Sequence, residues 1–197
     1  RIFVMPPRTR YTRDDLLSAA LALVRRDGMD ALNARSLAHE LGCSTQPLFR
    51  EFDSMAEIKQ EVYKRAFDVY SGYINESMSW NMPKYKSTGM AYIRFARDEP
   101  ELFKLIFMHV RPDGRRGDMK DDPNMNYVAE TIMRATGFSR EQALSFHLRS
   151  WIFAHGLATL LVTDYVDLSD EEISLLLSDQ FNALKMLYES RTESGKA

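Results

Sequence analysis

The stretch LAHELGCSTQPLFREF, residues 37–52, decides the fold of the N-terminal part of the chain. Its first half repeats apolar residues at helical spacing and stops at Gly42. A second helical run follows Ser44, which we expect to cap it, and Pro47 falls in its first turn, where a missing N–H costs little. The stretch therefore predicts a helix, a tight turn and a second helix.

Capping signals extend this pattern on both sides. Thr12, followed three residues later by Asp15, predicts the start of a helix that ends at Gly28. Ser54 and Glu57 form a capping-box pattern that opens a long helix. Three short helices thus precede a long one.

The remainder is also helical in pattern, and no segment alternates apolar and polar residues as a strand does. Residues 109–123 have neither periodicity nor apolar content, which predicts a long loop. We expect an all-α fold with further helices at 84–99, 100–108, 124–136, 139–163 and 169–189.

Composition is that of an ordinary globular protein, with 45% apolar and 27% charged residues among 197. It changes near Ser54, where longer and more apolar helices begin. We predict two domains: residues 1–53, with a basic arm and a helix-turn-helix, and residues 54–197, a larger helical domain.

One cysteine, Cys43, excludes an intrachain disulfide and a cysteine-based zinc site, and it suits a reducing compartment. No apolar run approaches the roughly 18 residues of a spanning helix. We expect a cytoplasmic protein with no membrane partner, no metal and no cofactor.

Charge is distributed unevenly. The formal net charge is -2, yet residues 1–13 carry four arginines and no acid, which leaves -6 for the rest. A basic arm on an acidic body can mark a nucleic-acid contact or can be a solvated tail. Position in the chain has to decide between the two.

In DNA-binding proteins the second helix of such a pair enters the major groove. We expect Leu48, Phe49 and Phe52 to face the small core. The outward side chains would be Thr45, Gln46, Arg50 and Glu51. Thr and Gln can bind base edges, and Arg can bind guanine or phosphate.

The first third of the chain resembles the tetracycline-repressor (TetR) family of bacterial transcriptional regulators. The resemblance is carried, in order, by Ala20, Gly28, Ala31, Leu32, Arg35, Leu37, Ala38, Leu41, Gly42, Ser44, Leu48, Phe49 and Phe52. It implies double-stranded DNA as partner, a homodimer and a small-molecule ligand. The predicted DNA-binding residues are Arg8, Arg10, Arg13, Arg35, Ser44, Thr45, Gln46, Phe49 and Arg50.

Three positions depart from the family pattern and remove ordinary phosphate contacts. Phe49 stands where a Tyr is usual, Glu51 where a His is frequent and Met55 where a Lys is common. Residues 14–65 hold seven basic and nine acidic side chains. We therefore expect the basic arm to supply an unusual share of DNA affinity.

Trp151, His155 and Gly156 resemble a branch of the family with a Trp-x-x-x-His-Gly signature. His147, Trp151, His155 and Thr159 recur every four residues and share one face of a helix. That stripe either lines a ligand pocket or fills the core. The pocket candidates are Phe95, Phe107, Met108, Met125, Tyr127, Trp151 and His155.

The last two predicted helices carry more apolar surface than a small bundle needs to cover itself. Such a surface fits a two-fold four-helix interface. The predicted interface residues are Leu144, Leu148, Ile152, Phe181, Leu184 and Tyr188.

An enzyme lacks support, since no metal-ligand spacing, phosphate loop or nucleophile elbow is present. A helical adaptor that binds a protein partner is the alternative to a DNA-binding regulator. We hypothesise a repressor that a small hydrophobic or aromatic effector releases from a palindromic operator. Sequence-specific DNA binding would separate the two readings.

Overall fold

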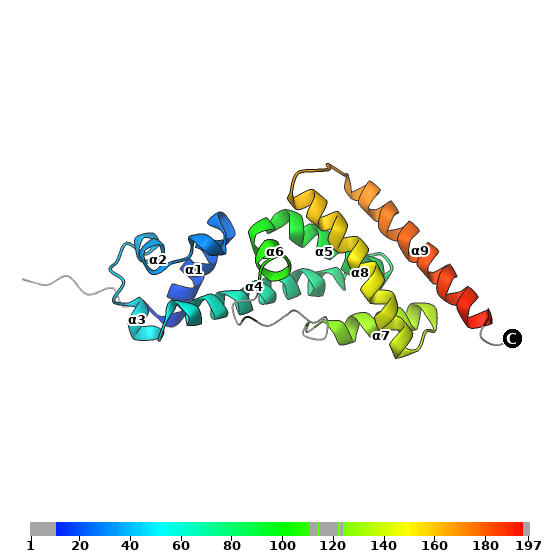
Figure 1. The fold of residues 1–197 in the computed structure, drawn as a ribbon, viewed down its shortest axis with the longest axis horizontal. Coiled ribbons are helices and arrows are strands. Elements are labelled where there is room, and N and C mark those ends of the chain that lie inside the picture. Colours follow the sequence, from blue (N-terminus) through cyan, green and yellow to red (C-terminus); the bar gives the residue numbers. More distant parts are fainter. Residues whose placement is uncertain (1–10, 111–113, 115–121, 123, 195–197) are drawn as a thin grey trace, which may run out of the picture. The chain divides into compact units, whose positions relative to one another are not determined.

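The computed structural model describes residues 11–110, 114, 122 and 124–194, with side chains up to Arg191. Within these residues the fold is all helical, as predicted, and none of the helices there is long and apolar enough to cross a membrane (Figure 1). The helices are α1 (Arg13–Asp27), the 3-10 helix η1 (Met29–Ala31), α2 (Ala34–Glu40), α3 (Leu48–Glu51), α4 (Met55–Ser77), α5 (Lys84–Asp98), α6 (Pro100–Phe107), α7 (Met125–Thr136), α8 (Arg140–Val162) and α9 (Asp170–Ser194).

Most helix ends follow the predicted capping signals. The Thr12 side chain accepts a hydrogen bond from the Asp15 N–H, and the Asp15 carboxylate accepts one from the Thr12 N–H. Ser139 starts α8 in the same way, and Gly137 ends α7 in the left-handed conformation, with φ 74°. Local sequence therefore determines where these helices begin and end.

Two compact units make up the chain. The first comprises Arg1–Phe67 and Glu101–Arg115, and the second comprises Asp68–Pro100 and Arg116–Ala197. Helix α4 begins in the first unit and ends in the second. The predicted boundary between residues 53 and 54 lies at the start of this helix, and as a division of function it stays a prediction.

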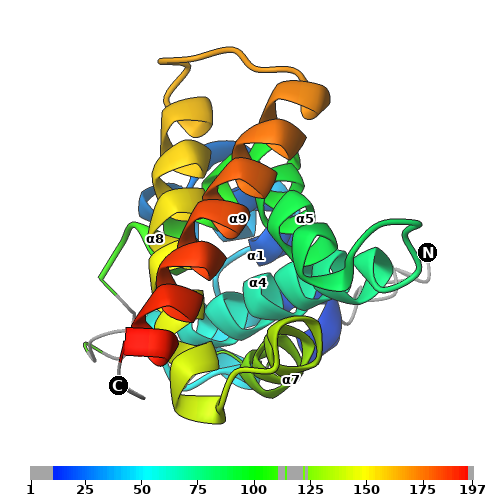
Figure 2. The same ribbon diagram turned by 90° about the vertical axis from the view of Figure 1, so that its right-hand side faces the viewer.

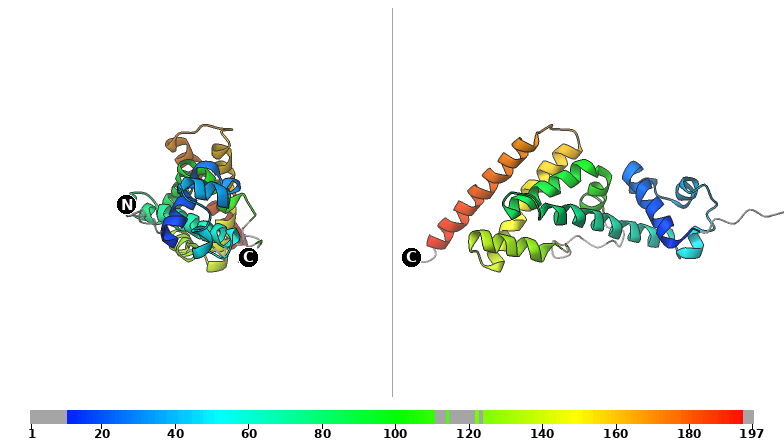
Figure 3. Two further views of the ribbon diagram at one scale, coloured as in Figure 1. Left: turned by 90° about the vertical axis from the view of Figure 1, so that its left-hand side faces the viewer. Right: turned by 180° about the vertical axis from the view of Figure 1, so that it is seen from behind.

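Figure 3 shows α1, α2 and α3 gathered around the beginning of α4. In the first unit these elements and α6 contribute the buried side chains. Helix α6 is separated in sequence from the other members by α5. Gly28 has φ 80°, and a Cβ atom there would lie 2.8 Å from a carboxylate oxygen of Glu101 in α6. The fully buried side chains of this unit include Leu16, Leu37, Leu48, Ile58, Leu102 and Phe103.

The second unit is organised around α8, which packs against α5, α7 and α9. Helices α8 and α9 run side by side (Figure 2). Phe146 lies at the centre of an aromatic cluster, with ring centroids 5.2 Å from Phe181 and 5.7 Å from both Phe138 and Tyr188. Large rings at these positions bury much apolar area per residue and set the spacing of the helices.

Two glycines of the second unit provide a matched test of backbone conformation. Neither Gly137 nor Gly72 has another heavy atom within 4 Å of an added Cβ, but only Gly137 has a positive φ. We expect Gly137→Ala to destabilise the unit by about 1 kcal/mol. Gly72→Ala, inside α4, should stabilise it by about 0.5–1 kcal/mol. Thermal unfolding measures both, and shifts of the same sign would contradict this account.

Candidate functional site

The turn between α2 and α3 is held by local hydrogen bonds. The Asn33 side chain accepts hydrogen bonds from the N–H groups of Arg35 and Ser36 and so caps α2. At the other end Gly42 takes φ 62°, and the Cys43 N–H donates to the Ala38 carbonyl at 3.0 Å. These bonds direct the chain out of α2 toward α3.

Helix α3 is shorter than predicted. It begins at Leu48, its N-cap is Pro47, and no side chain caps it, so the prediction that Ser44 caps this helix is wrong. Residues 45–47 form a turn in which the Leu48 N–H donates to the Thr45 carbonyl at 3.2 Å. Pro47 accounts for this, because a proline disfavours helical geometry in the residue before it.

Phe49 does not face the core as predicted, since half of its surface is exposed. Leu48 and Phe52 are buried, at 0% and 3% exposure. These two residues are four apart and share one face of the helix, whereas Phe49 is turned about 100° away from Leu48. A bare aromatic ring is therefore presented to solvent.

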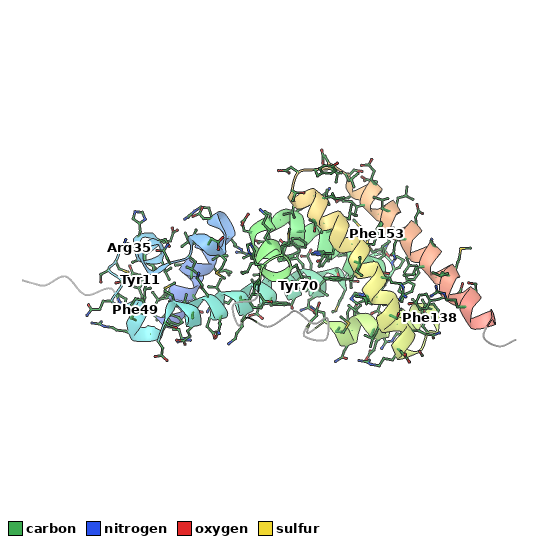
Figure 4. All side chains as sticks on the ribbon, in the orientation of Figure 1. Tyr11, Arg35, Phe49, Tyr70, Phe138 and Phe153 are labelled. Atoms are coloured by element: carbon green, nitrogen blue, oxygen red, sulfur yellow. The ribbon has the colours of Figure 1, made fainter. Side chains whose placement is uncertain are left out.

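The outward side of α2, the turn and α3 combines this ring with polar side chains. Arg35, Ser44, Gln46 and Arg50 are exposed, and Thr45 is half-buried. Within the described part of the chain neither Arg35 nor Arg50 has an ion-pair partner. Figure 4 labels Arg35 and Phe49 on this unit. Two unpaired guanidinium groups on one surface suit a polyanionic partner.

Arg13 is used differently from the prediction. Its guanidinium donates to the Glu51 carbonyl at 2.5 Å and to the Glu57 carboxylate at 2.6 Å, and it lies 4.1 Å from the centroid of the Phe52 ring. The Glu57 carboxylate also accepts from the Asp53 N–H at 2.7 Å. Arg13 therefore fixes the end of α3 to the start of α4, and its contact with phosphate stays a prediction.

The N-terminal segment also contains Arg8, Arg10 and Tyr11. Arg8 and Arg10, the other predicted arm contacts, lie outside the described residues. Tyr11 was not predicted to matter, yet its hydroxyl donates to the Leu41 carbonyl at 2.6 Å (Figure 4). This bond joins residues 30 apart in sequence, so no local pattern indicates it.

A cavity of about 840 Å³ lies within the second unit. Residues of α4, α5, α7, α8 and α9 surround it. Most of its wall is aromatic or aliphatic, as in many small-molecule sites. The lining includes Tyr70, Ile74 and Met78 of α4; Tyr85, Thr88 and Tyr92 of α5; Tyr127 of α7; His147, Ser150 and Trp151 of α8; and Leu177, Gln180 and Phe181 of α9.

Two tyrosine–histidine hydrogen bonds join α5 to α8 at this cavity. The Tyr85 hydroxyl lies 3.0 Å from His147 Nδ1, and the Tyr92 hydroxyl lies 2.9 Å from His155 Nδ1. Burial lowers the pKa of His147 to about 4 and raises the pKa values of both tyrosines. All three lining side chains, Tyr85, Tyr92 and His147, are thus uncharged at neutral pH.

One lining carboxylate, Asp122, precedes α7. Its Oδ1 accepts hydrogen bonds from the Asn124 N–H at 2.8 Å and from Asn124 Nδ2 at 3.0 Å. Its Oδ2 accepts only a long bond, 3.4 Å, from the Tyr70 hydroxyl of α4. Burial raises the pKa of Asp122. The sequence did not single out this residue, because it lies in the segment predicted to be a loop.

Two of the predicted pocket residues line this cavity, and their contact with a ligand stays a prediction. Tyr127 and Trp151 line the cavity, and His155 stacks on Trp151 with ring centroids 5.0 Å apart. Phe95 instead fills the core between Tyr70 and Tyr73, and Met125 is buried outside the cavity lining. The stripe of α8 thus lines the pocket and also packs in the core.

Phe107 and Met108 are wrong as pocket residues. Both lie in the first unit, whereas the cavity is lined by residues of the second. Phe107 packs against Phe103 with ring centroids 5.3 Å apart, and Met108 is exposed. Helix α6 joins the first unit, and no periodicity in its sequence indicates which unit it packs on.

Apolar side chains also cover the outer face of α8. Leu148, Ile152 and Leu160 are exposed by 42%, 57% and 40%, and Phe153 is exposed beside them (Figure 4). Leu144, the remaining predicted residue of α8, is half-buried. The α8 part of the predicted interface is therefore open in the single chain.

The α9 part of that prediction requires correction. Phe181 lines the cavity, Tyr188 is buried against Phe138, and Leu184 packs on the same cluster. The α9 stripe is broad, and the sequence could not show which of its flanks faces inward. The exposed apolar side chains of α9 are Leu175, Leu176, Met186 and Leu187.

Comparison with known proteins agrees with this architecture. Residues 86–183 match the family described as tetracyclin repressor-like, C-terminal domain. An uncharacterized HTH-type transcriptional regulator of Mycobacterium tuberculosis is 25% identical over 197 residues, covering 94% of this chain and 85% of the relative.

Solved structures show the same fold. A protein of unknown function from Rhodococcus sp. RHA1 has a TM-score of 0.63 at 21% identity, covering 93% of this chain and 98% of that one. A TetR variant from Acinetobacter baumannii AYE, solved with minocycline, has a TM-score of 0.55 at 18% identity, covering 91% and 97%.

These matches define a helix-turn-helix transcriptional regulator rather than an enzyme. The chain belongs to the TetR family. Membership in the branch with the Trp-x-x-x-His-Gly signature stays a prediction.

The buried histidine of the cavity predicts a specific pH dependence. An unfolded His147 binds a proton near pH 6.5, whereas the folded one does so only near pH 4. Between these values the unfolded state binds more protons, so acidification lowers the free energy of unfolding, by up to about 3 kcal/mol. His147→Phe should flatten this slope, and His39→Gln, an exposed control, should not. Equal slopes in all three proteins would show that His147 is not the group responsible.

Proposed function

We propose that this regulator is a homodimer that binds a palindromic operator and releases it when a small hydrophobic or aromatic molecule occupies the cavity. The observation that carries the proposal is the continuity of α4. Its first part belongs to the helix-turn-helix unit, and its second part supplies Tyr70, Ile74 and Met78 to the cavity wall. A ligand that contacts these residues acts on a helix that the DNA-binding unit shares.

Release of DNA requires the ligand to prefer one arrangement of α4 over another. The resulting coupling equals the difference in ligand affinity between the two arrangements, typically about 1–3 kcal/mol. A ligand that binds both arrangements equally would leave operator affinity unchanged. An effector therefore relieves repression only if it binds one arrangement of α4 more tightly than the other.

DNA recognition is assigned to the exposed side of α2, the turn and α3. Arg50 and Gln46 supply base or phosphate contacts, and Arg35 supplies a phosphate contact. Phe49 has no hydroxyl for a phosphate, so its ring is assigned an apolar contact, for which the methyl group of thymine is the natural target. Arg8 and Arg10 add sequence-independent affinity to this surface.

Dimerisation is assigned to the outer faces of α8 and α9. Leu148, Ile152 and Leu160 leave an apolar surface that water solvates poorly, and Leu176 and Leu187 extend it along α9. A two-fold axis through this face forms a four-helix interface and carries two recognition segments. That symmetry gives two half-sites, which we expect about one helical turn apart.

The first test is selection of binding sites from a random duplex pool at about 150 mM salt, where weak electrostatic binding is suppressed. We expect a palindrome to be enriched. Arg50→Ala should then weaken binding by about 1–3 kcal/mol per half-site, and Arg140→Ala, an exposed arginine of the second unit, should not. Absence of any enriched sequence would favour an adaptor in which exposed Phe49 binds protein.

The same duplex measures the contribution of the N-terminal arm. Replacing Arg8 and Arg10 with alanine should reduce the slope of log affinity against log salt by about two units per protomer, since each phosphate contact contributes about 0.9. An unchanged slope would show that Arg8 and Arg10 do not contact DNA.

The proposed dimer is tested by placing a charged residue in its apolar face. Ile152→Arg places two charges at the proposed two-fold interface and should convert the dimer to monomers, because a buried unpaired charge is costly. Val110→Arg changes an aliphatic residue of the first unit that is more exposed, 84% against 57% for Ile152, and serves as the control. Analytical ultracentrifugation gives the masses, and a dimeric Ile152→Arg variant would exclude this face.

A further inference from the structure

Asp122 is the one carboxylate among the described residues that line the cavity. It is partly buried, and its Oδ2 has only the 3.4 Å bond from the Tyr70 hydroxyl. Within the described part of the chain no basic side chain pairs with it. A carboxylate in such surroundings is costly to ionise unless a positive charge approaches it.

Two tyrosine rings of the cavity wall interact with this carboxylate. The ring centroids of Tyr70 and Tyr92 lie 6.1 Å apart in an edge-on arrangement, and the charge of Asp122 acts on both phenols. Tyr127 and Trp151 belong to the wall of the same cavity. The faces of such rings attract cations, most strongly where water is excluded.

Three basic side chains among the described residues also border the cavity. We expect them to interact with a bound ligand less strongly than Asp122 does. The Lys84 ammonium already donates to the carbonyls of Met78 and Trp80, at 2.7 and 3.2 Å. Arg134 is exposed and pairs with Glu130 at 3.2 Å, and Lys86 is half-buried. His147 is neutral. Lys84 and Arg134 lie nearer to solvent than Asp122, so their charges act through a higher effective dielectric.

We propose that the cavity binds a lipophilic organic cation, with its positive centre beside Asp122 and its apolar groups against the tyrosine and tryptophan rings. That this cation acts as the effector rests on the proposed function. Binding itself requires no DNA.

The site also gives the cation a means of acting on α4. Tyr70 belongs to α4 and donates its hydroxyl to the same Oδ2 that a cation would occupy. A positive centre there competes for that oxygen, while the Asn124 bonds to Oδ1 keep the carboxylate in place. A cation at Oδ2 therefore displaces the Tyr70 hydroxyl, which belongs to the helix that both units share.

Two ions of nearly equal size and opposite charge test the inference: tetraphenylphosphonium and tetraphenylborate. In calorimetric titrations of the full chain without DNA, we expect the cation to bind at least about tenfold more tightly than the anion. Asp122→Asn should remove most of this preference by weakening cation binding alone. Asp167→Asn, an exposed aspartate of the loop before α9, is the matched control and should change neither affinity.

The possible results are decisive in both directions. Equal affinities, tighter binding of the anion, no binding of the cation or an unchanged preference in Asp122→Asn would each overturn the inference. Because the comparison of ions is made first on the unsubstituted chain, a variant that fails to fold does not prevent the test. Cation binding through Asp122 without operator release would instead contradict the proposed function and leave the assigned ligand class standing.

Discussion

The packing of α8 is the constraint on which the second unit depends. This helix is apolar on nearly every side, so each of its faces requires its own cover. Phe146, Ala154 and Leu157 are buried among neighbouring helices, while Ile152 and Leu160 on the outer side remain exposed. Burying all of this surface within one small unit is impossible, because α5, α7 and α9 already occupy the inner faces. The exposed remainder accounts for the proposed dimer.

A polar seam along α8 produces the cavity. His147 and His155 reach hydroxyls on α5, and these hydrogen bonds hold the two helices apart at a distance set by tyrosine side chains. Apolar residues at the same positions would permit closer packing and would fill the space. The Tyr85–His147 bond thus satisfies a largely buried histidine at the cavity wall, and the Tyr92–His155 bond ties the same two helices together.

In the proposed mechanism, α4 connects the cavity to the DNA-binding unit. Ile58 and Val62 are fully buried in the helix-turn-helix unit, and Ile74, also buried, borders the cavity four turns further along. An uninterrupted helix of this length transmits a rotation or a tilt with little loss, because its backbone hydrogen bonds resist bending. Occupation of the cavity and the position of the recognition segment are therefore mechanically linked in the proposed mechanism.

The sequence by itself determined the helices and most of their ends, since capping residues such as Thr12 and Ser139 and the left-handed Gly137 act within a few residues. It also indicated the helix-turn-helix, through the apolar spacing around Gly42. Only the tertiary structure decided which flank of each amphipathic helix faces inward. That choice turned Phe49 outward and Tyr188 inward, and it brought Asp122 to Tyr70 across 52 residues. Such contacts depend on packing between elements distant in the chain, for which a local pattern holds no information.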